Sequence, residues 1–126
     1  MKGKKVLIVD DDEFLLDMYV LKFREAGFEV EIARNGEEAV EKAESLNPDI
    51  ILLDVVMPKT DGFDVLRALK KKNVAQKALL FLLTNLGQKE DIERGMKLGA
   101  NDYIVKAHFT PSEVVAKVNS YIEKTK

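Results

Sequence analysis

The hydrophobic positions of this chain fall into short runs that alternate with longer, more polar segments. Five runs have the length and composition of β-strands, at residues 5–10, 29–33, 49–54, 78–84 and 102–106. The third contains four consecutive aliphatic residues at 50–53, as expected for a strand buried on both faces. The second alternates polar and apolar residues, which predicts a half-exposed strand at the edge of a sheet.

The intervening segments carry helix signals, which predict helices at residues 12–26, 37–46, 62–72, 88–98 and 110–124. Gly27 and Gly99 follow the first and fourth of these segments, at a position where helices commonly end. Asn35 is predicted to cap the second helix, and Thr110 with Glu113 forms a predicted capping box for the last. Five successive strand–helix units predict an α/β fold, a doubly wound parallel sheet with helices on both faces.

Composition narrows the possible classes of protein. A chain of 126 residues suits one domain, and we expect residues 1–126 to form it. The net charge of −2 gives no reason to expect nucleic acid or a membrane surface as a partner. The absence of cysteine excludes disulfides and thiolate metal sites. The N-terminal apolar run has only four residues, too few for a signal peptide or a membrane span, so we expect a cytoplasmic location.

Polar side chains stand at the predicted carboxyl ends of four strands, namely Asp10, Asp11, Asp54, Thr84 and Lys106. In a parallel sheet these ends meet at one edge, where α/β proteins bind their ligands. Carboxylates gathered there repel one another, each close pair costing on the order of 3–4 kcal/mol at an effective dielectric constant of about 20. A bound Mg²⁺ would remove this cost, and the ammonium and hydroxyl groups could then bind the oxygens of an anion.

Each of these residues also has an ordinary explanation. The acids at 10–12 could favour the dipole at a helix N-terminus. Asp54 could begin a turn, Thr84 is a common strand residue, and Lys106 could lie on the surface. Their joint occurrence at four strand ends favours a functional site.

The set resembles the response-regulator receiver domain of two-component signalling, over essentially the whole chain and in the manner of a single-domain chemotaxis regulator. The matching motifs are the acid pair in LIVDDD, the aspartate in LLDVVMPKTDG, the threonine in FLLTN and the lysine in YIVK. The resemblance implies a flavodoxin-like sheet of order 2-1-3-4-5. It also implies that Asp54 accepts a phosphoryl group from a sensor histidine kinase or a phosphotransfer protein. Such a chain would catalyse only its own phosphorylation and dephosphorylation, and would otherwise not be an enzyme.

The resemblance further implies a metal site for Mg²⁺, with Mn²⁺ as a possible substitute. Asp54, Asp11 and the backbone carbonyl of Val56 would be ligands, and Asp10 would act through water.

Thr84 and Lys106 would bind the phosphoryl oxygens. Tyr103 would change rotamer when Thr84 moves, and the surface around residues 88–106 would pass the signal to an unknown downstream protein.

Two positions depart from the family pattern. Asn85 follows Thr84 where a small residue is usual, and Ala107 follows Lys106 where proline, typically after a cis bond, is usual. A cis bond before a residue other than proline costs about 2.5–4 kcal/mol, so the 106–107 peptide is predicted to be trans. His108 is expected to be a solvated loop residue.

The predicted first helix carries more apolar residues than one core-facing stripe needs. On a helical wheel, Phe14, Met18 and Leu21 lie nearly opposite the core face. Isolated exposed apolar side chains are ordinary. The functional alternative is that this stripe docks the kinase or phosphotransfer protein.

Two other functions compete with a phosphorylated receiver. A degenerate receiver would bind a partner without being phosphorylated, and a phosphatase on a similar fold would use an aspartyl nucleophile. The chain could be a stand-alone regulator or a receiver cut from a longer protein.

Overall fold

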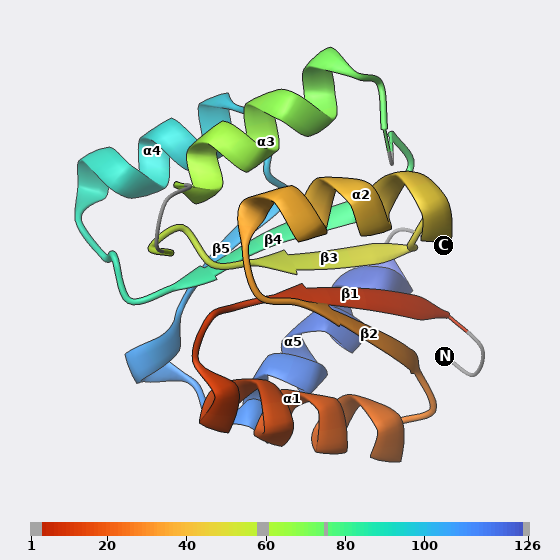
Figure 1. Cartoon of the computed structure of the whole chain (residues 1–126). Coiled ribbons are helices and arrows are strands. Elements are labelled where there is room, and N and C mark those ends of the chain that lie inside the picture. Colours follow the sequence, from red (N-terminus) through yellow and green to blue (C-terminus); the bar gives the residue numbers. More distant parts are fainter. Residues whose placement is uncertain (1–3, 58–60, 75, 125–126) are drawn as a thin grey trace.

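The computed structural model contains a five-stranded parallel sheet with helices on both faces (Figure 1). The structure describes residues 4–57, 61–74 and 76–124. The strands are β1 (Lys5–Val9), β2 (Glu29–Ala33), β3 (Ile50–Leu53), β4 (Leu79–Thr84) and β5 (Asp102–Val105). The helices are α1 (Glu13–Glu25), α2 (Gly36–Leu46), α3 (Gly62–Lys71), α4 (Lys89–Lys97) and α5 (Pro111–Lys124), with one 3₁₀ turn, η1 (Lys106–His108). Each predicted strand and helix is present, with end shifts of the usual size.

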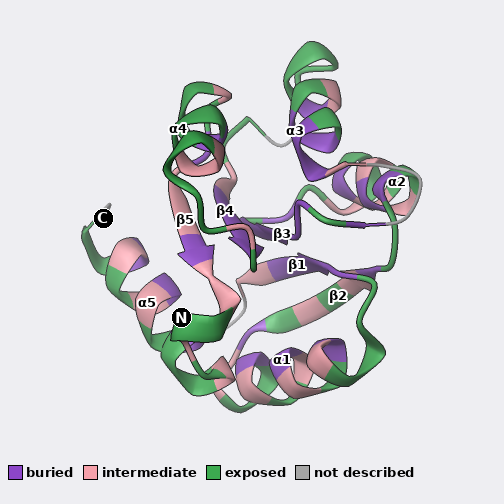
Figure 2. Cartoon of the chain, turned by 90° about the vertical axis from the view of Figure 1, so that its left-hand side faces the viewer, coloured by how far each residue is buried: buried purple, intermediate pink, exposed green. Residues whose placement is uncertain are grey.

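The strands lie in the order β2-β1-β3-β4-β5 and pair in parallel throughout, which confirms the predicted doubly wound, flavodoxin-like fold. The order reverses between β1 and β3, so a ligand crevice is expected at the carboxyl ends of these two strands. β2 is an edge strand whose residues are mostly exposed or half-buried, as its alternating sequence predicts (Figure 2).

The central strands send alternate side chains into two separate cores. Ile50 and Leu52 pack in the core that includes residues of α1 and α5, whereas Ile51 and Leu53 pack in the core that includes residues of α2 and α3. The two groups of helices lie on opposite faces of the sheet (Figure 1). Full burial of an aliphatic side chain contributes roughly 1.5–3 kcal/mol, so β3 is held firmly from both sides. A residue at its carboxyl end therefore has a well-defined position.

The predicted helix caps are confirmed. The Asn35 carboxamide oxygen accepts a hydrogen bond from the Glu38 amide at 2.9 Å. Thr110 and Glu113 form the reciprocal capping box, at 3.2 and 2.8 Å. Asp12 caps α1 by accepting from the Leu15 amide at 3.2 Å, so the ordinary explanation of the N-terminal acids holds for this residue. Within the described residues, no helix combines the length and apolar character that a membrane span requires.

Candidate functional site

The ends of β1 and β3 bring three carboxylates together. Asp10 and Asp54 each follow the last residues of adjacent strands, Val9 and Leu53, which are paired in the sheet. One oxygen from each of Asp10, Asp11 and Asp54 lies within 4.8 Å of the others. Asp10 and Asp54 are buried, whereas Asp11 is exposed. The sheet register thus creates the acidic cluster that the strand ends predicted.

Lys106, at the end of β5, lies between the two buried acids. Its ammonium group donates to Asp10 Oδ2 at 2.5 Å and to Asp54 Oδ2 at 3.0 Å, and its side chain is only 8% exposed. Burial acts to lower the pKa of Lys106, but the hydrogen bonds and charges of the two acids outweigh it, and the pKa is raised. Neutralisation by a metal alone, as expected from the acids in the sequence, is therefore incomplete, because Lys106 already neutralises part of the cluster.

The buried carboxylates are oriented by donors on both oxygens. Besides Lys106, Asp10 accepts from the Asp12 amide at 3.0 Å, and Asp54 accepts from the Val56 amide at 3.1 Å. Burial raises the pKa of Asp10, although its hydrogen bond with Lys106 opposes the rise. Among the described residues, Asp11 forms no hydrogen bond or ion pair, so both of its oxygens are accessible. This all-oxygen donor set fits a hard divalent cation such as Mg²⁺.

The acids open into a cavity of about 390 Å³ at this end of the sheet. Its lining combines four acids, one lysine, and other side chains from α1, from the end of β4 and from the loops after β3 and β4: Asp10, Asp11, Asp12, Leu15, Asp54, Val56, Thr84, Asn85, Leu86 and Lys106. Val56, whose carbonyl is one of the expected metal ligands, lies at the rim and is 57% exposed. A cavity with both carboxylates and an ammonium group can hold a cation and an anion together.

Thr84 and Tyr103, the predicted switch pair, are linked through Leu86. The Thr84 hydroxyl is fully buried and accepts from the Leu86 amide at 3.4 Å. The Tyr103 hydroxyl donates to the Leu86 carbonyl at 2.6 Å. Burial, with smaller effects from Asp91 and Asp54, raises the pKa of Tyr103 to about 12, so its hydroxyl remains a donor at neutral pH. Sequence reasoning missed Leu86, since nothing in its residue type indicates this role.

The sequence pattern of the response regulator receiver domain matches residues 6–119, a segment that includes every one of these polar side chains. The chain belongs to the response regulator receiver family. The receiver is 41% identical over 118 residues to the chemotaxis protein CheY of Thermotoga maritima, covering 93% of this chain and 96% of CheY. It is 37% identical over 123 residues to the alkaline phosphatase synthesis transcriptional regulatory protein PhoP of Bacillus subtilis, covering 98% of this chain and 50% of PhoP.

Solved structures show the same fold. The receiver domain of the Francisella response regulator 1452 superposes with a TM-score of 0.87 at 33% identity, covering 98% of this chain and 99% of that one. The chemotaxis protein CheY4 of Vibrio cholerae superposes with a TM-score of 0.86 at 31% identity. The match covers 94% of this chain and 98% of CheY4. The receiver spans about half the length of PhoP and of other transcriptional regulators that it matches.

In this receiver, Gly62 brings the start of α3 directly against the backbone at the end of β3, beside Asp54. Its amide donates to the Val55 carbonyl at 2.8 Å. A Cβ atom at this position would lie 2.4 Å from the Asp54 carbonyl oxygen. The preceding residue, Asp61, caps α3 by accepting from the Phe63 amide at 2.6 Å. Glycine is thus required where the chain, nine residues after the end of β3, returns against the backbone of Asp54 and Val55.

The receiver's two departures from the family pattern lie close together. The Ala107 amide donates to the Asn85 carboxamide oxygen at 3.0 Å. No peptide bond between described residues is cis, which confirms the predicted trans bond between residues 106 and 107. The chain turns here through η1, and His108 is exposed, as expected of a loop histidine.

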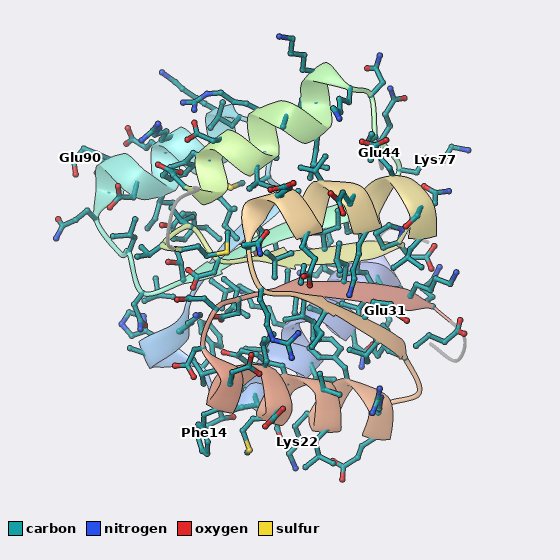
Figure 3. All side chains as sticks on the ribbon, viewed as in Figure 1. Phe14, Lys22, Glu31, Glu44, Lys77 and Glu90 are labelled. Atoms are coloured by element: carbon teal, nitrogen blue, oxygen red, sulfur yellow. The ribbon has the colours of Figure 1, made fainter. Side chains whose placement is uncertain are left out.

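The apolar stripe on α1 lies outside the core of the receiver. Phe14 is 73% exposed and Leu21 51% exposed, while Met18 is half-buried. Phe14 points away from the body of the protein (Figure 3). Leu16 and Tyr19, on the other side of the helix, are fully buried. The stripe therefore forms a surface beside the cavity and contributes nothing to its lining.

Proposed function

We propose that this receiver accepts a phosphoryl group on Asp54 from the phosphohistidine of a sensor histidine kinase or a phosphotransfer protein. One observation carries the proposal. Asp54 lies in the same cavity as an accessible acid, Asp11, and two groups able to bind phosphoryl oxygens, Lys106 and Thr84. Membership of the receiver family supports this assignment.

In the transfer, an Asp54 oxygen attacks phosphorus and the bond between phosphorus and the donor's imidazole nitrogen breaks. The electron pair of that bond returns to the imidazole ring, which then takes up a proton. Lys106 and Thr84 donate to the phosphoryl oxygens, so this chain acts by positioning and charge neutralisation. Asp10, Asp11, Asp54 and the Val56 carbonyl would hold Mg²⁺, which when bound neutralises negative charge on the phosphoryl group.

The phosphoryl group also supplies the signal. It adds a charge of about −1.5 to −2 and strong acceptor oxygens beside Thr84 and Lys106. Movement of Thr84 toward these oxygens displaces Leu86, and through it Tyr103. The surface formed by α4 and β5 then adopts a second arrangement that a downstream protein recognises.

The test is phosphorylation by acetyl phosphate with Mg²⁺, followed by mass spectrometry. The wild-type chain and Asp17→Asn, which alters an exposed acid on α1, should each gain one phosphoryl group. Asp54→Asn should gain none while keeping the wild-type fold. Wild-type protein that gains no phosphoryl group would instead support an unphosphorylated binding module, and turnover of a phosphomonoester would support a phosphatase.

The apolar stripe of Phe14, Met18 and Leu21 is the proposed docking surface for the kinase or phosphotransfer protein. The stripe is exposed, and α1 begins directly after Asp12, which lines the cavity. A partner helix lying on this stripe would bring a phosphohistidine to the cavity mouth. Exposed apolar patches beside a reactive site commonly mark such contacts.

A further inference from the structure

A hydrogen bond joins the two loops that carry the proposed phosphoryl ligands. Asn85 directly follows Thr84, and Ala107 directly follows Lys106. The Ala107 amide donates to Asn85 Oδ1 at 3.0 Å. Because the backbone group is a donor, the atom facing it must be the carboxamide oxygen, which fixes the orientation of the Asn85 side chain.

This hydrogen bond is not part of the backbone pairing between β4 and β5. Thr84 and Val105 are the last paired residues of β4 and β5, so the Asn85 bond lies beyond the end of the strand ladder. Proline at 107 would have no amide hydrogen to donate, and a small apolar residue at 85 would have no acceptor. The bond therefore depends on both departures from the family pattern occurring together.

Among the described residues, the side-chain hydrogen bonds of Thr84 and Lys106 do not join the two loops. Lys106 is held by Asp10 and Asp54, at the ends of β1 and β3. The Thr84 hydroxyl has a long hydrogen bond, to Leu86 within its own loop. The Asn85 bond is thus a direct polar connection between the residue that follows one proposed phosphoryl ligand and the residue that follows the other.

We propose that Asn85 is a positioning residue of the phosphoryl site, which holds the loops after β4 and β5 together so that Thr84 and Lys106 keep their relative positions. This role rests on the proposed function. Asn85 also lines the cavity, and its amide NH₂ group has no partner among the described residues. Loss of the bond should slow phosphorylation by roughly threefold to tenfold, the range expected for one neutral hydrogen bond.

The first experiment is amide hydrogen exchange followed by NMR, which requires no phosphorylation. Asn85→Leu keeps the size of the side chain and removes the acceptor, and Asn85→Ala removes both. In either variant the Ala107 amide should exchange faster than in the wild type. The Leu80 amide, which donates to Asn101 Oδ1 at 2.8 Å far from the cavity, serves as an internal control and should be unchanged. His108→Ala, an exposed change in the same loop, should leave the Ala107 amide protected.

The second experiment measures the rate of phosphorylation by acetyl phosphate with Mg²⁺. Asn85→Leu and Asn85→Ala should be slowed by the same factor, with only the small fall in melting temperature that the loss of one hydrogen bond causes. His108→Ala should match the wild-type rate. Unchanged exchange of Ala107 in Asn85→Leu would overturn the proposed connection. Faster exchange with an unchanged rate, or slowing in Asn85→Ala alone, would overturn the positioning role. Wild-type protein that takes up no phosphoryl group would overturn the proposed function and the positioning role with it, while leaving the exchange result intact.

Discussion

Thr84 and Tyr103 are joined through one residue, since Leu86 donates its amide to the Thr84 hydroxyl and accepts the Tyr103 hydroxyl on its carbonyl. The Tyr103 ring lies close to Gly95 of α4, where an added Cβ would be 3.2 Å from it. In the proposed mechanism, a displacement of Thr84 would reach α4 through these two hydrogen bonds and one ring contact. Phosphorylation of Asp54 would then change a surface that lies outside the cavity.

Replacing Tyr103 by phenylalanine should uncouple this route without blocking phosphorylation. The substitution removes one hydrogen bond and should lower the free energy of unfolding by about 0.5–1.5 kcal/mol. Acetyl phosphate should still modify Asp54, but the NMR shift changes that phosphorylation causes in α4 and β5 should shrink. Shift changes as large as those of the wild type would show that the signal bypasses Leu86.

The same variant should alter the alkaline pH dependence of stability. Because the folded-state pKa of Tyr103 is raised from 10.0 to about 12, the neutral hydroxyl favours the folded state fully below pH 10.0. This contribution is lost as the pH rises toward about 12. Denaturation curves across this range should show that the stability difference between wild type and Tyr103→Phe narrows, and a constant difference would contradict the raised pKa.

Replacing Lys106 by methionine should destabilise the protein strongly at neutral pH. Asp10 and Asp54 would remain buried without their ammonium partner, a change that typically costs about 3–5 kcal/mol. The already raised pKa of Asp10 should rise further. A carboxyl group whose pKa is raised in the folded state stabilises the fold at low pH, where it is protonated. This contribution to the free energy of unfolding is lost as the pH rises through the folded-state pKa. Urea denaturation should therefore show that the difference in unfolding free energy between the wild type and Lys106→Met becomes smaller as the pH is lowered.

The control for this prediction is Lys117→Met, which removes a half-exposed ion pair with Asp102. Exposed pairs contribute about 0–1 kcal/mol, so this variant should be nearly as stable as the wild type. A Lys106→Met protein with wild-type stability and the wild-type pH profile would mean that water, and not Lys106, stabilises the buried acids.

Addition of Mg²⁺ should raise the melting temperature through Asp11. At a concentration of 100 times Kd, a ligand that binds only the folded state contributes about 2.7 kcal/mol. Asp11→Asn should abolish the rise, because it removes the accessible carboxylate of the cluster. Asp12→Asn should preserve it, since asparagine also caps helices well and Asp12 belongs to α1. A melting temperature that does not respond to Mg²⁺ in the wild type would refute the metal site.

Gly62→Ala should damage both stability and phosphorylation. The added methyl group would meet the backbone of Asp54 and Val55 at 2.4 and 2.5 Å, so α3 or the end of β3 must move. Gly87→Ala is the matched control, because its methyl group would lie at an ordinary 3.6 Å from the Val105 side chain. Thermal denaturation and acetyl phosphate labelling should separate the two variants, and equal behaviour would show that the close approach at Gly62 is easily relieved.

The docking surface can be tested with Met18→Lys combined with Leu21→Glu. Surface changes usually alter stability by about 0.5 kcal/mol or less each, and labelling by acetyl phosphate should survive. Transfer from the cognate kinase should fall sharply. Met96→Lys, at a methionine 43% exposed on α4, is the control and should leave transfer intact. A large loss of stability would place the stripe in the core, and unchanged transfer would place the partner elsewhere.

The sequence alone determined the elements and their order. Secondary structure depends on runs of apolar residues and on cap residues such as Asn35 and Thr110. These signals act over a few neighbouring positions, so they can be recognised in the sequence without a structure. The same pattern placed Asp10, Asp54 and Lys106 at strand ends, and the parallel sheet then required these ends to share one edge. The family resemblance supplied the strand order and the expected chemistry.

Only the tertiary structure decided how these side chains meet. Lys106 lies between Asp10 and Asp54, Leu86 joins Thr84 to Tyr103, and Asn85 binds Ala107. Each arrangement brings together residues from different strands or from the loops that follow them, and its geometry depends on sheet register, loop path and side-chain rotamers. These are selected jointly by packing against both faces of the sheet and by the charges gathered at its edge. No local sequence pattern encodes this combination of packing and charge. The strand-end positions of the polar groups could therefore be predicted, whereas their hydrogen-bond partners could not.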